Sequence, residues 1–307
     1  MKAMSPLPKF PPAIYKYVRT AFRAANKRVC EKLARVPNCP EQSLDMTLID
    51  TLSSYAAPAV VAPGWLVRID VHFLGGLRHF YNWEIADIGV LVFAKRAGAV
   101  LANKVAVLQS KRLYPDQGTV IEQTPEDFNI GLGTLVPGGH EAPLSQSHLF
   151  PFSPASKYKA LIVDDRQYQA IRDYEAKHHI PVHYLFYNPW AIPVTYTFPV
   201  SGSTRLGPRG NGGTRVAPAE RLRAVLAGRS AGYHPSFSDL NHVVSAKPSH
   251  ASGWRLEYFM ADLVMKCEQG RLFQSLEEED IFGLFNRRSG PIAAAVAVTI
   301  EQSEGFG

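Results

Sequence analysis

Apolar residues near the start of the chain recur at the spacing of a helix. Between residues 11 and 34 they fall three or four positions apart, at Ile14, Val18, Phe22 and Ala25. This spacing places them on one face of an α-helix. Residues 38–40 (NCP) interrupt the pattern, and a proline is well suited to the first position of the helix that follows. We therefore predict a second helix over residues 40–55, with a leucine at every fourth position as its buried stripe.

The middle of the chain is rich in residues that favour β-strands. We predict strands over residues 65–74 (WLVRIDVHFL), 84–94 and 104–111 (KVAVLQSK). The turn at residues 96–98 (RAG) joins the last two into an antiparallel hairpin. Residues 181–187 (PVHYLFY) predict a further core strand. Residues 291–300 are continuously apolar, which is typical of a strand buried on both faces.

Further helices are predicted over residues 156–178, 218–226 and 254–269, and the acidic run at 277–280 starts another. Residues 201–216 (SGSTRLGPRGNGGTRV) predict a flexible loop, with no GK[ST] sequence of a phosphate-binding P-loop. The order of elements indicates an α/β fold, with a mixed β-sheet core flanked by helices and extra helical elements at both ends. We divide the chain into a basic helical segment (1–40), a core (41–200) and a C-terminal region (201–307).

The charge of the chain favours an anionic partner. The net charge is +6, and residues 2–35 hold nine lysines and arginines against the single acid Glu31. Such a run is either a solvated helix face or a surface that follows phosphates. The three cysteines form no CxxC pair, which argues against structural zinc and for a reducing compartment. Without an apolar leader or a membrane-spanning run, the sequence predicts a cytoplasmic protein that does not bind membranes.

Three polar residues interrupt the apolar hairpin strands. Alternate side chains of a strand share a face, so Gln109 and Lys111 point the same way. Asp87 opens the preceding strand, and antiparallel pairing brings it to the end that holds Gln109 and Lys111. Burying such groups is costly unless they are paired or bind a metal. The hairpin therefore contains either a functional site or a buried salt bridge with an amide partner.

This arrangement resembles the PD-(D/E)XK, or restriction-endonuclease-like, nuclease superfamily over roughly residues 41–190. Asp87 matches the first acid of the family motif, and Gln109-Ser110-Lys111 matches the second part in its Gln-x-Lys variant. Glu41, three residues before the buried position Leu44, is the candidate for the acid that the family often carries on a helix. The resemblance implies a restriction-endonuclease-like sheet and a metal-dependent phosphodiesterase activity.

The resemblance also implies roles for individual residues. Mg²⁺ or Mn²⁺ would be held by Asp87, the Gln109 amide and the Ser110 carbonyl, with Glu41 or Glu84 completing the site. Glu84 reaches it only through a strand bulge and is otherwise a polar strand end. Lys111 would orient a water molecule or stabilise charge on the phosphate. Arg112 would contact a phosphate beside the metal. Independently of the resemblance, the arginines of the 201–216 loop either add affinity for nucleic acid or belong to a plain surface loop; they are Arg205, Arg209 and Arg215.

The resulting hypothesis is a nuclease acting on DNA, with RNA as the alternative, in microbial antiviral defence or DNA processing. A protein partner or homo-oligomer would control its activity. Because Gln109 replaces the usual carboxylate, a second hypothesis is a catalytically degenerate module that only binds nucleic acid or a partner protein. A third is a structural subunit of a larger complex, docked through the acidic run at 277–280 and the C-terminal helices.

Overall fold

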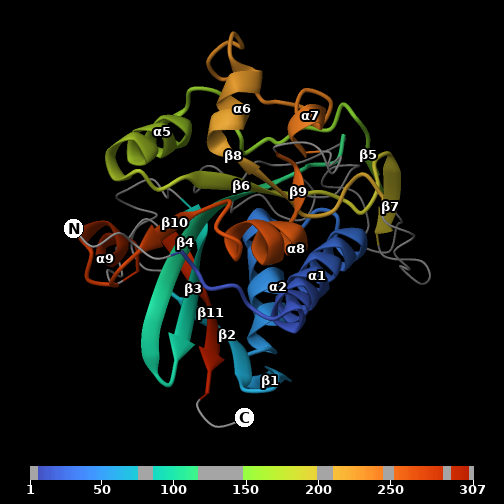
Figure 1. Ribbon diagram of the computed structural model, residues 1–307. Helices are drawn as coiled ribbons and strands as arrows, with labels where there is room; N and C mark the ends of the chain where they lie inside the picture. The colour runs from blue at the N-terminus through green and yellow to red at the C-terminus, as the bar shows by residue number, and fades with distance from the viewer. Residues whose placement is uncertain are drawn as a thin grey trace.

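A large mixed β-sheet forms the centre of the fold (Figure 1). The computed structural model describes residues 6–74, 86–116, 148–198, 210–244, 252–285 and 292–303. Within them the strand order is β1-β2-β11-β3-β4-β6-β8-β9, and β10 pairs with β4. The strands are β1 (Ala59–Ala62), β2 (Trp65–Phe73), β3 (Ala86–Arg96), β4 (Ala99–Arg112), β6 (Val182–Tyr187), β8 (Arg215–Pro218), β9 (Trp254–Arg255), β10 (Arg271–Phe273) and β11 (Ile292–Gln302). A separate ribbon pairs β5 (His148–Phe152) with β7 (Val194–Phe198).

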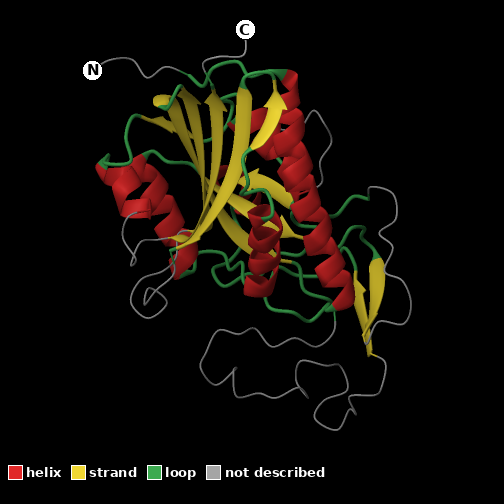
Figure 2. Cartoon of the chain, turned by 90° about the horizontal axis from the view of Figure 1, so that it is seen from below, coloured by secondary structure: helices red, strands yellow, loops and turns green. Residues whose placement is uncertain are grey.

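Helices cover both faces of this sheet, so the fold is a mixed α/β structure (Figure 2). On one face lie α1 (Pro12–Arg35), α2 (Glu41–Ser53), the short α8 (Leu256–Tyr258) and a π-helical turn, η2 (Phe259–Val264). The opposite face packs against α5 (Arg166–His178), α6 (Ala219–Leu226), α7 (Asn241–Val244) and α9 (Glu279–Phe285). None of the helices in the described ranges is long and apolar enough to cross a membrane.

The predicted hairpin and the final strand meet at the centre of the sheet. β3 and β4 are antiparallel and joined by a turn at Ala97 and Gly98, both with positive φ. β11 runs parallel to β3 and antiparallel to β2. Its alanines and valines are largely buried on both faces, as the continuous apolar run predicted. The C-terminal region therefore contributes to the same sheet as residues 59–112.

Two of the predicted helices are wrong in part. Residues 156–165 do not form the start of α5, because they pair with residues 233–237 through contacts such as Tyr158 N to Pro235 O, 2.9 Å. Asp165 then caps α5 by accepting from Tyr168 N. The helix predicted over 254–269 is shorter than expected, because residues 254–255 pair with β8 as a short strand. Only α8 and η2 follow, and they end at Val264.

Candidate functional site

The predicted polar residues of the hairpin lie close together where β4 ends. The β3–β4 pairing sets Ile88 opposite Leu108, so Asp87 lies beside Gln109. Gln109 Nε2 donates to Asp87 Oδ2 at 2.6 Å, and the Ser110 backbone N–H donates to the same oxygen at 2.7 Å. Gln109 is only 2% exposed. Asp87 is therefore held by two donors from the neighbouring strand.

Helix α2 supplies two acids to this site, Glu41 and Asp45, which lie one helical turn apart. Glu41 Oε2 accepts a hydrogen bond from the Arg112 backbone N–H at 2.7 Å, and its Oε1 lies 3.9 Å from Lys111 Nζ. The first turn of α2 thus reaches the end of β4. Lys111 is buried, with a side chain only 4% exposed.

Asp45 was not predicted to belong to the site. Its Oδ1 accepts from Ser110 Oγ at 2.5 Å and from Tyr187 Oη of β6 at 2.6 Å. Residues four apart on a helix share a face, so the spacing from Glu41 to Asp45 was the signal that could have identified it. Asp45 anchors α2 to both β4 and β6 directly behind the motif residues.

Burial and mutual repulsion hold these acids towards their neutral forms. Burial raises the pKa of Glu41 to about 7; the Asp87 charge also raises it, whereas Lys111 and Arg112 lower it. Burial also raises the pKa of Asp45 well above its ordinary range, and the charges of Asp87 and Glu41 add to the effect. Added positive charge at this site would stabilise the ionised carboxylates.

The oxygen atoms around Gln109 fit a hard divalent cation with few protein ligands. No group of three or more His, Cys, Asp or Glu side chains in the described ranges is arranged to hold a metal. However, Asp87 Oδ2 and the Ser110 carbonyl both accept from Gln109 Nε2, at 2.6 and 3.3 Å. Gln109 Oε1 is buried and has no hydrogen-bond partner in this part of the structure. Carboxylate and carbonyl oxygens are the ligands that Mg²⁺ prefers, and it commonly retains several waters.

The arginine that follows the motif lies inside the fold. Arg112 is 1% exposed, and its Nη2 donates to the Pro37 carbonyl at 2.6 Å. Its guanidinium carbon lies 4.4 Å from the centre of the Tyr114 ring, and Lys159 Nζ lies 5.6 Å from the same centre. Arg112 therefore fixes the α1–α2 connection to the end of β4. Its location differs from the surface contact expected for a phosphate ligand.

Of the remaining candidate residues, only Arg215 lies in the described part of the chain, and its side-chain contacts are made elsewhere in the fold. Arg215 was expected in a flexible loop, but it begins β8 and is 2% exposed. Its guanidinium donates to the carbonyls of Asn211, Gly212 and Gly253. The prediction of a loop is therefore wrong at this position, because strand pairing and buried carbonyls hold the arginine in the interior. Glu84, Arg205 and Arg209 lie outside the described residues.

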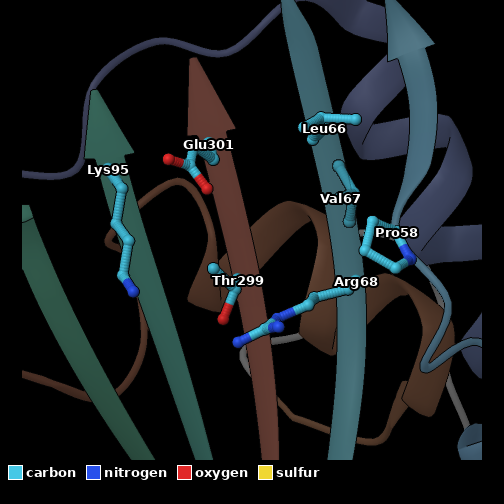
Figure 3. Close-up of a pocket in the computed structure, with 7 residues that line it drawn as sticks. All are labelled: Pro58, Leu66, Val67, Arg68, Lys95, Thr299 and Glu301. Atoms are coloured by element: carbon cyan, nitrogen blue, oxygen red, sulfur yellow. The ribbon is translucent and has the colours of Figure 1, made fainter. Parts of the chain in front are cut away.

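A pocket on the sheet lies far from the candidate site. It is lined by residues of β2, β3 and β11, among them Arg68, Lys95 and Thr299. In Figure 3, Arg68 extends towards Thr299, and Lys95 lies on the other side of β11. Arg68 also pairs with Asp70 at 3.0 Å. Lys95 is eight residues from Asp87 along β3, about 26 Å at the rise of a strand. The pocket therefore contributes nothing to the site around Asp87.

Comparison with known proteins identifies no relative: no protein-family model, no curated protein and no solved structure matches the chain. A functional assignment must therefore come from the geometry of the site itself.

Proposed function

We propose that this chain is a metal-dependent nuclease of the PD-(D/E)XK type that hydrolyses phosphodiester bonds in DNA, with RNA as the alternative substrate. One observation carries the proposal. Asp87, Gln109 and Lys111 lie together on two adjacent strands, and Glu41 reaches Lys111 from the first turn of α2. The antiparallel β3–β4 pair followed by the parallel strand β6 supports a restriction-endonuclease-like core.

The proposed roles follow from the donor atoms. Asp87, the Gln109 amide oxygen and the Ser110 carbonyl would hold Mg²⁺ or Mn²⁺. When bound, the ion supplies positive charge at the scissile phosphate and lowers the pKa of a water molecule. Lys111 Nζ donates to the attacking water or to a phosphate oxygen, which stabilises developing negative charge. Glu41 is a positioning residue, because it contacts Lys111 and the Arg112 amide.

The charge distribution supports a polyanionic substrate. The net charge is +6, and Lys159 lies beside Tyr114, two residues after the end of β4. The basic face of α1 is partly neutralised, since Arg19 pairs with Asp262 at 2.6 Å. We therefore assign phosphate contacts to Lys159, near the end of β4, in addition to the exposed cations of α1. A cytoplasmic role in antiviral defence or DNA processing, controlled by a partner or by self-association, is part of the proposal by analogy with the superfamily.

A cleavage assay tests the proposal directly. Supercoiled plasmid, single-stranded DNA and RNA are incubated with Mg²⁺, Mn²⁺ or EDTA and the native chain, Asp87→Asn or Lys111→Met. Lys177→Met, at an exposed position of α5, is the matched control. We expect cutting that needs a metal, survives in the control and falls by about a hundredfold or more in the two site variants. Cutting in EDTA, or full activity in Lys111→Met, would refute the assignment.

One observation favours a second candidate, the catalytically degenerate module. Gln109 presents an amide N–H to Asp87 where the commonest family pattern has a second carboxylate. Such a chain would bind DNA equally well with and without Mg²⁺, and Asp87→Asn would leave that binding unchanged. Equal binding by all variants, with no cleavage under any metal, identifies this function.

A further inference from the structure

We propose that the side-chain amide of Gln109 acts as a built-in substitute for the cation, and that a divalent ion binds only after this amide rotates by half a turn. The inference rests on the proposed metal site and adds a condition for filling it. Gln109 would then determine which cations the site accepts.

The position of the amide nitrogen carries the inference. Nε2 lies 2.6 Å from Asp87 Oδ2 and 3.3 Å from the Ser110 carbonyl oxygen. These are two of the three oxygens proposed as metal ligands, and one partially positive N–H₂ group bridges them. The third proposed ligand, Gln109 Oε1, points away and has no hydrogen-bond partner in the described structure, although it is buried. The amide nitrogen thus gives the Asp87 and Ser110 oxygens a hydrogen-bond donor, whereas the amide oxygen has no partner of its own in the described structure.

Rotation about the last side-chain torsion exchanges these two atoms. Oε1 would then stand beside a carboxylate oxygen and a carbonyl oxygen, and three acceptors in contact repel one another. Only a positive charge between them can hold this arrangement, and Mg²⁺ and Mn²⁺ prefer such oxygen ligands. The two amide orientations therefore correspond to the cation-free and the cation-bound site.

The exchange weakens cation binding. When a cation binds, the amide must rotate and the hydrogen bond from Gln109 Nε2 to the Asp87 carboxylate is broken. Loss of a hydrogen bond to a charged group corresponds to roughly a ten- to hundredfold change in an equilibrium constant. A monovalent ion offers half the charge to offset this loss. We therefore expect the site to fill with Mg²⁺ or Mn²⁺ and to reject Na⁺ and K⁺.

The test measures cation binding without any substrate. Mg²⁺ is titrated by calorimetry into the native chain, Gln109→Glu and Gln109→Met. The Gln109→Glu side chain presents only oxygens, so we expect binding at least tenfold tighter than native. Gln109→Met has a similar length but neither donor nor oxygen, so we expect weaker binding than native.

The orientation of the amide is read by ¹⁵N-edited NMR. The Gln109 side-chain N–H₂ signals are those missing from the spectrum of Gln109→Met. They should move when Mg²⁺ is added to the native chain, as the hydrogen bond to Asp87 breaks. Mg²⁺ binding that leaves these signals in place would overturn the inference but not the nuclease proposal. Cleavage that fails while the signals respond to Mg²⁺ would overturn the nuclease proposal alone. If neither the native chain nor Gln109→Glu binds Mg²⁺, both proposals fail.

Discussion

Glu41 gives the candidate site a measurable signature in the stability of the protein. Its carboxylate is buried and near the Asp87 charge, and its pKa is raised to about 7 from an ordinary value of 4.5. A raised carboxyl pKa means that the folded state binds the proton more tightly than the unfolded state. The stability that protonation of Glu41 contributes to the folded state is therefore complete below pH 4.5 and is lost as the pH rises through 7.

The size of the effect follows from the two pKa values. One pKa unit is worth about 1.4 kcal/mol, so the shift from 4.5 to about 7 corresponds to about 3 kcal/mol of unfolding free energy. The substitution Glu41→Gln removes the titration and keeps an oxygen that can accept from the Arg112 amide. Relative to this variant, the native chain should lose about 3 kcal/mol of stability between pH 4.5 and pH 8.

Urea unfolding in EDTA, at pH 4.5, 5.5, 6.5 and 8, checks this prediction. The difference between native and Glu41→Gln at each pH isolates Glu41 from all other titrating groups. Glu31→Gln is the control, because Glu31 pairs with Arg28 at the surface of α1. Parallel stability curves for native and Glu41→Gln would refute the account of the Glu41 environment.

Three further predictions concern the surroundings of the site. Asp45→Ala leaves the Ser110 and Tyr187 hydroxyls without their acceptor, so urea unfolding should show a loss of about 2–6 kcal/mol, and Asp45→Asn a smaller one. Gly89→Ala places a methyl carbon 2.6 Å from Ile292 Cδ1, and its melting curve should indicate a loss of about 1–3 kcal/mol. Lys159→Gln should lower the slope of log Kd against log salt concentration for DNA binding by about 0.9, because one phosphate contact is lost. An unchanged slope would exclude that contact.

The parts of the site that the sequence predicted depend on local periodicity. Strand alternation and one tight turn suffice to bring Asp87 towards Gln109. Asp45 required knowledge of how α2 is rotated against β4 and β6, which depends on packing of the whole core.

Pairing between strands that are distant in the sequence explains the remaining differences between the predicted and the observed elements. Strand β11 lies between β2 and β3, and no local pattern indicates this partnership. Arg215 was assigned to a loop from the glycines around it, whereas pairing of β8 with β6 fixes its position. The apolar pattern after Trp254 suits a helix, but the pairing of β9 with β8 takes its first two residues.

The interpretation of Lys111 and Glu41 as a purely structural ion pair makes a different prediction from the nuclease site. A buried ion pair offsets its desolvation only with close geometry. Here Lys111 Nζ and Glu41 Oε1 are 3.9 Å apart, beyond hydrogen-bond distance, and the short contact of Glu41 is to the Arg112 backbone. The raised Glu41 pKa also indicates that Lys111 does not offset the desolvation.

A double-mutant cycle in stability separates these interpretations. It compares Glu41→Gln, Lys111→Met and the double variant with the native chain at pH 8, where Glu41 is largely ionised. We expect a coupling energy below about 1 kcal/mol, typical of a loosely held pair. A coupling of about 3 kcal/mol or more would show that the two side chains stabilise the fold as a pair. In that case Lys111 would be needed for stability, and its burial would no longer argue for a catalytic role.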